Sequence, residues 1–287
     1  MPEIEAFADG RTAQTAAEAF EILGHRFQRG RWAFRGHSDA RWELRPSLER
    51  MAAPGDQLQC AENYVRTEFQ RRAHHYHIEL PARENTLEWL ALMQHHGAPT
   101  RLLDWTESAY VAAFFSTVTL PPPGQSAAIW AIDLDALNDR AVEMIEPFYP
   151  TNHSPAFFCD VRTCSYWPTF DTVFMNPHPA APGVIVPVKP YRMNERLTIQ
   201  QGIFLCPSTL RMGFQAILNH MLQSPNESGV VKKEWLLKLQ ILPSARLEML
   251  RELRKMNISY TTLFPGLDGF GASLNTEVQI YLDTPSS

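Results

Sequence analysis

Apolar side chains recur every three or four residues in five stretches of the chain, the spacing that places them on one face of a helix. In the first stretch, for example, Ala17, Phe20, Leu23 and Phe27 share such a face. The pattern predicts helices over residues 12–28, 57–78, 86–96, 108–118 and 244–256.

Shorter runs that are rich in β-branched and aromatic residues predict strands. These runs lie at 32–36, 127–137, 183–188 and 234–242. Residues 194–205 alternate polar and apolar side chains and end in an apolar run, and the tail at 277–282 is a further candidate strand. Because helices and strands do not alternate regularly, the order favours an α+β fold with a mixed, split antiparallel sheet and flanking helices.

One domain over residues 1–287 accommodates these elements, since this length suits a single large domain. Residues 143–182 interrupt the pattern, because they show no period and contain many proline and aromatic residues. A disordered segment would contain fewer aromatic residues. We therefore predict a loop-rich insertion at about 143–182.

Composition and charge narrow the classes of function. The net charge is −5, so no global basic field indicates nucleic acid, although a local basic patch is compatible with it. Residues 1–10 lack the basic and apolar regions of a signal peptide, and no apolar run approaches 18 residues. We expect a cytoplasmic protein that makes no membrane contact, and the sequence does not indicate its oligomeric state.

Neither the cysteines nor the clustered histidines have the spacing that is typical of metal ligands. The four cysteines form no CxxC pair. His74, His75 and His77 are close in sequence, but only His74 and His77 share a face of a helix, and no carboxylate has matching spacing. We therefore expect no metal. The face that includes Arg71 and Arg72 is expected to be solvated, with contact to nucleic acid as the alternative.

A polar stretch at 94–106, with the sequence QHHGAPTRLLDWT, separates two of the predicted apolar helices. Polar groups that enter a core must be paired, so such a stretch usually forms a network or binds a ligand. The side chains in question are Gln94, Thr100, Arg101, Asp104, Trp105 and Thr106. The sequence therefore predicts a functional site at this stretch.

Four motifs in this order resemble the FRG domain, which is named after its Phe-Arg-Gly motif. They are Phe34-Arg35-Gly36, the stretch 94–106, the segment 196–204 and LFPGLDGF at 263–270. The resemblance extends from about residue 30 to residue 272.

The order of these segments is also similar to that of ADP-ribosyltransferases, which have a strand ending in Arg-Gly, a Ser/Thr-rich strand and an apolar helix. This similarity implies an ADP-ribosyltransferase-like fold and NAD as substrate. ADP-ribose would be transferred to a macromolecular acceptor, a nucleic acid or a protein, and the protein would act as a toxin or phage-defence effector.

The similarity also implies roles for individual residues. Arg35 would hold the diphosphate, and Gly36 would let the backbone approach the nicotinamide amide. Thr100 and Thr106 would position the ribose, and Trp105 would stack on a ring. The further candidates for contacts with NAD are Gln94, Arg101, Arg196 and Gln200.

The catalytic carboxylate departs from the transferase pattern. Cleavage of the nicotinamide–ribose bond passes through an oxocarbenium-like state that a carboxylate stabilises. The segment expected to hold a glutamate contains Gln200 and Gln201 instead. Asp104 is then the first candidate for this role, and Gln201 is the other residue that would face the reacting carbon. Glu195 and Glu277 are weaker choices.

Structural roles remain open for the same residues. Arg35 could pair with Asp104 to join two strands, and Asp104 or Thr106 could cap the helix that follows. Gln200 and Gln201 on a strand would point to opposite faces, so one of them would face a pocket. The alternative functions are a non-catalytic module that binds a nucleotide or nucleic acid, and an interaction domain whose polar stretch is purely structural.

Overall fold

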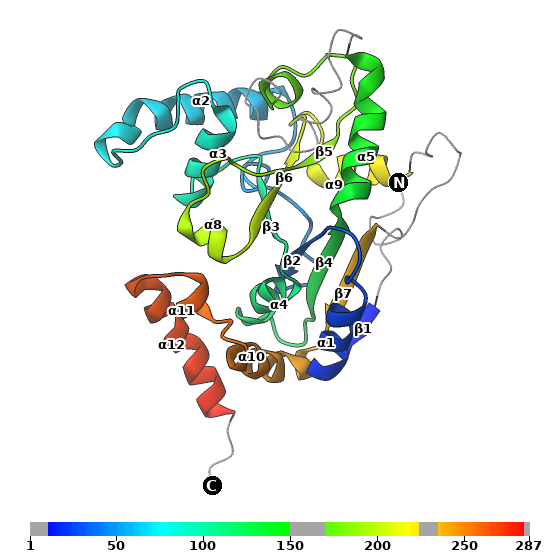
Figure 1. Ribbon diagram of the computed structural model, residues 1–287, viewed down its shortest axis with the longest axis vertical. Coiled ribbons are helices and arrows are strands. Elements are labelled where there is room, and N and C mark those ends of the chain that lie inside the picture. Colours follow the sequence, from blue (N-terminus) through cyan, green and yellow to red (C-terminus); the bar gives the residue numbers. More distant parts are fainter. Residues whose placement is uncertain (1–10, 150–169, 224–234, 284–287) are drawn as a thin grey trace.

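The computed structural model describes residues 11–149, 170–223 and 235–283, which form a seven-stranded sheet with flanking helices (Figure 1). The strands are β1 (Arg11–Ala13), β2 (Trp32–His37), β3 (Leu103–Thr106), β4 (Ala127–Asp133), β5 (Ile185–Val188), β6 (Gly202–Pro207) and β7 (Leu236–Ile241). Their order across the sheet is β1-β7-β4-β2-β3-β6-β5, and only the β1–β7 pair is parallel. The predicted α+β class with flanking helices is confirmed.

Helices cover both faces of the sheet. The α-helices are α1 (Ala16–His25), α2 (Asp56–Arg72), α3 (Thr86–His95), α4 (Ala109–Thr117), α5 (Leu134–Ile145), α8 (Glu195–Ile199), α9 (Phe214–Gln223), α10 (Arg246–Lys255), α11 (Tyr260–Leu263) and α12 (Leu267–Leu282). Short 3-10 turns are η2 (Ala73–His75), η3 (Glu146–Phe148) and η5 (Pro243–Ala245), and η4 (Asp171–Met175) is a π-helix.

Two hydrophobic cores lie on opposite faces of the sheet, because side chains along a strand alternate in direction. On β4, Trp130 and Ile132 enter the first core with apolar residues of α3, α5 and α9. Ile129 and Ala131 enter the second core with apolar residues of α1, α4 and α10. β4 is thus buried on both faces, which explains its continuous apolar run.

The strands β2 and β3 are joined at a single position. Phe34 pairs with Thr106, whereas β2 pairs with β4 along all six of its residues. The two strands are therefore not laddered beyond Phe34, at Arg35 and Gly36. This opening in the middle of the sheet positions the site described below.

The five predicted helices and the four predicted strands are confirmed, with shifted ends. The helix predicted at 57–78 ends at Arg72 and continues only as the η2 turn. The strand predicted at 127–137 ends at Asp133, because the carboxylate of Asp133 accepts hydrogen bonds from the backbone N–H groups of Asp135 and Ala136 and caps α5.

The strand predicted at the apolar end of 194–205 is confirmed as β6, whereas the alternating start of this segment and the tail at 277–282 are not strands. Residues 194–205 form the short helix α8, a turn and then β6, because the side chain of Asn194 caps α8 by accepting from the backbone N–H of Leu197 at 2.8 Å. The tail at 277–282 belongs to α12. Ion pairs of Glu277 with Arg254, and of Asp283 with Arg251, hold this helix against α10.

The predicted insertion at 143–182 falls partly on residues 150–169, which lie outside the described residues. The described part of this segment consists of the end of α5, η3, η4 and an extended stretch that leads into β5. Within the described ranges, no helix is long and apolar enough to span a membrane.

Replacing Gly36 with alanine should lower the free energy of unfolding by about 1–3 kcal/mol, because overpacking forces the neighbouring backbone to move. An added Cβ would lie 2.1 Å from the carbonyl oxygen of Ala112 and 2.5 Å from the backbone nitrogen of Ser116, both on α4. The close approach that requires glycine is thus to a helix of the protein. Urea denaturation measures the effect.

The matched control is Gly271→Ala in α12, where nothing lies within 4 Å of the added Cβ. Alanine favours a helix over glycine, so this variant should be unchanged or more stable by up to about 1 kcal/mol. Equal stability of Gly36→Ala and the wild type would contradict the packing argument.

Candidate functional site

A cavity of about 250 Å³ lies at the opening between β2 and β3. Three separate segments line it, namely the end of β2 with the turn after it, the strand β3 with helix α4, and the helix α8. The residues concerned are Phe34, Arg35, Gly36, Ser38, Trp42, Asp104, Trp105, Thr106, Phe115, Thr119, Arg196 and Gln200. Seven of these are residues that the sequence singled out.

Arg35 connects the two diverging strands at the floor of this cavity. Its Nη1 donates a hydrogen bond to the backbone carbonyl of Asp104, and its Nε donates to Nε2 of His37 at 3.0 Å. Burial lowers the pKa of Arg35, and the charge of Asp104 opposes this effect. The structural alternative, in which Arg35 joins two strands by pairing with Asp104, is therefore confirmed in part. Arg35 joins the strands through the backbone carbonyl of Asp104 and not through its carboxylate.

His37 supplies a neutral acceptor for Arg35. Burial and the charge of Arg35 lower the pKa of His37 to about 3. The imidazole is therefore uncharged near neutral pH, and its Nε2 has a lone pair for the guanidinium. This arrangement orients Arg35 without neutralising its charge.

A relay of side chains orients the carboxylate of Asp104, which is exposed. Oδ2 of Asp104 accepts a hydrogen bond from Nε2 of Gln94 at 2.8 Å, and Oε1 of Gln94 accepts from the hydroxyl of Thr100 at 2.6 Å. Gln94 and Thr100 do not line the cavity. Gln94 and Thr100 therefore position Asp104. Neither residue lies where it would contact a ligand in the cavity.

Arg101 is the second cation of the stretch, and it points into the core. It is completely buried and forms an ion pair with the equally buried Glu62. It also donates hydrogen bonds to the carbonyl of Phe174 and to the side-chain oxygen of Gln59. Arg101 therefore anchors β3 to α2 and does not reach the cavity.

Trp105 and Thr106 line the cavity from β3. Trp105 is 3% exposed, and its indole N–H has no hydrogen-bond partner within the described part of the chain. The hydroxyl of Thr106 donates to the backbone carbonyl of Gln200 at 2.6 Å and accepts from the backbone N–H of Ser108 at 3.0 Å. Thr106 thus ties the third segment to β3, while Ser108, and neither Asp104 nor Thr106, caps α4.

A family model matches this part of the chain. The FRG domain model aligns with residues 30–122. Residues 30–122 form an FRG domain. No curated protein and no solved structure matches the chain.

The FRG domain includes β2, β3 and α4, and therefore two of the three segments that line the cavity. Arg35, Gly36 and the stretch 94–106 all lie within it. The third segment, with Arg196 and Gln200, follows the FRG domain in sequence and completes the cavity in space.

Arg196 and Gln200 reach the cavity from the end of α8. The guanidinium of Arg196 lies over the ring of Phe264 at 4.5 Å, and Nε2 of Gln200 donates to the carbonyl of Leu263 at 3.0 Å. Gln201 has a positive φ of 48°, is exposed and is not part of the cavity lining. These residues were predicted as part of a strand but form a turn. The turn places Gln200 beside the FRG domain and directs Gln201 away from the cavity.

Asp104 is the one carboxylate among the described residues that line this cavity. Glu195 and Glu277 do not contribute, and Glu277 pairs with Arg254 on α10. The other five lining residues were not predicted as site residues, and they are Phe34, Ser38, Trp42, Phe115 and Thr119. For Trp42 a signal existed, since a tryptophan in a polar loop just after the FRG motif is unusual.

Metal chemistry has no visible support in the described ranges, where no three side chains of His, Cys, Asp or Glu converge to hold an ion. The rings of His74 and His75 have centroids 4.0 Å apart and are tilted by 41° to each other.

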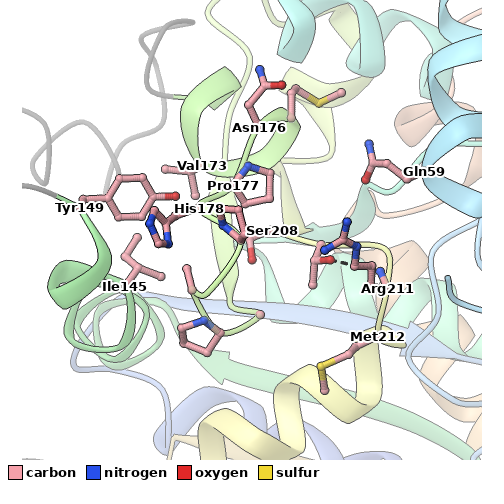
Figure 2. A pocket seen from close by; sticks show the side chains of 16 residues that line it. Gln59, Ile145, Tyr149, Val173, Asn176, Pro177, His178, Ser208, Arg211 and Met212 are labelled. Atoms are coloured by element: carbon pink, nitrogen blue, oxygen red, sulfur yellow. Dashed lines mark hydrogen bonds between the residues drawn. The ribbon is translucent and has the colours of Figure 1, made fainter. Parts of the chain in front are cut away.

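A second cavity, of about 420 Å³, lies beside η4, the segment that leads into β5 and the segment that follows β6 (Figure 2). Its polar side chains hold the surrounding loops. Ser208 accepts from the backbone N–H of Val184 at 2.9 Å, and Arg211 forms an ion pair with Asp56. None of the predicted site residues lines it, so the cavity at β2 and β3 is the better candidate.

Proposed function

We propose that the cavity at β2 and β3 binds NAD and that the protein is an ADP-ribosyltransferase-like enzyme, which transfers ADP-ribose to a macromolecular acceptor. One observation supports this most. A guanidinium (Arg35), a carboxylate (Asp104) and an amide (Gln200) from three separate segments line one cavity. Packing alone gives no reason for collecting these groups at an opening in a sheet.

The cavity suits the nicotinamide–ribose half of NAD. Its volume of about 250 Å³ is below the usual range for a whole drug-sized ligand, so the adenosine half would extend outside. Arg35 and Arg196 would hold the diphosphate, and the ring of Trp42, which is 53% exposed, offers a stacking surface.

The reaction needs a negative charge beside the anomeric carbon of the ribose. As the bond from this carbon to the nicotinamide nitrogen breaks, its electron pair leaves with neutral nicotinamide, and the ribose gains oxocarbenium character. Asp104 would stabilise this cation. A nucleophile of the acceptor then forms the new bond to the same carbon and releases a proton, so charge and atoms balance.

Arg35→Ala should weaken binding of NAD by about tenfold or more, because it removes the cation at the floor of the cavity. Isothermal titration calorimetry measures the affinity. Arg251→Ala is the matched control, since Arg251 lies on α10 and pairs with Asp283. Equal affinities in all three proteins would remove the support for the NAD site.

A non-catalytic nucleotide-binding module is the second candidate. It is favoured by the glutamines at the turn where the transferase pattern expects a glutamate. The two candidates differ in one measurement. Incubation of NAD with the protein and a cell extract should release nicotinamide if the protein is a transferase, whereas a melting shift with NAD and no release would indicate the module.

A further inference from the structure

A third cavity, of about 600 Å³, opens between α2, η2 and α3, apart from the cavity that contains Arg35 and Asp104. Five of its ten lining residues carry a ring, namely Tyr64, Phe69, Tyr76, His77 and His96. We call it the aromatic cavity. The proposed NAD site uses none of these residues.

The rings at the rim of the aromatic cavity face solvent. Tyr76 is 89% exposed and Tyr64 is 68% exposed. The rings of Tyr76 and His75 are edge to face with centroids 6.4 Å apart. The ring of His75 is in turn tilted against that of His74. Exposed aromatic rings gathered around a cavity indicate a binding surface, and they are the platforms on which unpaired bases stack.

Cationic side chains surround these rings. Residues 64–83 contain four arginines against two glutamates, whereas the net charge of the whole chain is −5 with histidine counted as neutral. Glu68 pairs with both Arg71 and Arg72, so one carboxylate faces two guanidinium groups. This surface is therefore positive relative to the rest of the chain. A positive surface attracts a polyanion more strongly than an acidic or neutral groove would.

A basic ridge joins the aromatic cavity to the candidate NAD site. The ridge is the end of α3, where His96 lines the aromatic cavity and Gln94, two residues earlier, donates a hydrogen bond to Asp104 of the candidate NAD site at 2.8 Å. His77 and His96 line the aromatic cavity, and Arg196 lines the NAD site. Figure 1 shows α3, which ends at His95, between α2 and α8.

We infer that the aromatic cavity binds an unpaired base of a single-stranded nucleic acid, whose backbone follows the ridge towards Asp104. Rings supply the stacking surface and the arginines supply contacts to phosphates, the combination typical of single-strand binding. Binding itself does not depend on NAD. That the bound strand is the acceptor of ADP-ribose rests on the proposed function.

Fluorescence anisotropy without NAD tests the inference. The probes are fluorescein-labelled 20-nucleotide single-stranded DNA, single-stranded RNA of the same sequence, and duplex DNA. We expect the wild type to bind a single strand more tightly than the duplex and less tightly as salt increases. The two single strands distinguish DNA from RNA. Tyr76→Ala should raise the dissociation constant about tenfold, because a stacking platform is lost.

Tyr281→Ala is the matched control, because Tyr281 is 79% exposed on α12. It should bind as the wild type does. Failure of the wild type to bind either single strand overturns the inference and leaves a protein acceptor. Wild-type affinity in the double variant Tyr64→Ala/Tyr76→Ala also overturns it. If strands bind as expected but NAD releases no nicotinamide, the proposed function fails and this binding site stands.

Discussion

Replacing Glu62 with alanine should lower the free energy of unfolding by about 3–5 kcal/mol, the largest effect on stability that we expect in this chain. Glu62 and Arg101 are both fully buried. Burial alone lowers the pKa of Arg101, but the charge and hydrogen bonds of Glu62 raise it above its ordinary value. Without Glu62, a guanidinium would remain in the core with no opposite charge, and urea denaturation would measure the cost.

Glu68→Ala is the matched control on the same helix. Glu68 pairs with Arg71 and Arg72 at the surface, where salt bridges contribute about 0–1 kcal/mol. A double variant, Glu62→Leu with Arg101→Met, should regain part of the loss, because an apolar pair of similar volume leaves no charge buried. A loss below about 1 kcal/mol in Glu62→Ala would show that the pair does not anchor β3 to α2.

Asp104→Asn should reduce the rate of nicotinamide release from NAD by about 100-fold or more, because it removes the negative charge that stabilises the developing cation. Asparagine preserves the size of the side chain and can still bond to Gln94. The affinity for NAD should therefore change only severalfold. Chromatography of released nicotinamide and calorimetry of NAD binding separate the two effects.

Glu107→Gln controls for the loss of one carboxylate near the site. Glu107 is three residues further along the chain, pairs with Lys189 and does not line the cavity. Its rate should stay near that of the wild type. A wild-type rate in Asp104→Asn would exclude Asp104 as the stabilising group, and no release by the wild type would favour the nucleotide-binding module.

Many of the helices and strands were predictable because the spacing of apolar residues along the chain determines them. The apolar faces of helices α1 to α4 and the continuous apolar run of β4 are local patterns that the tertiary structure then buries. Predictions failed where a local capping signal competed with alternation, as at Asn194 before α8. The strand predicted at 277–282 is wrong because this segment pairs with no strand of the described sheet, while ion pairs to α10 hold it as a helix.

The stretch 94–106 is recognisable from its residues alone as polar where a core is expected, and its side chains must therefore be paired. Which partner each side chain takes depends on the tertiary structure. Arg101 turns to Glu62 in the core, whereas Asp104 turns to the cavity under the control of Gln94. These partners are 39 and 10 residues away in the chain, and pairing over such separations depends on how helices pack and not on local spacing.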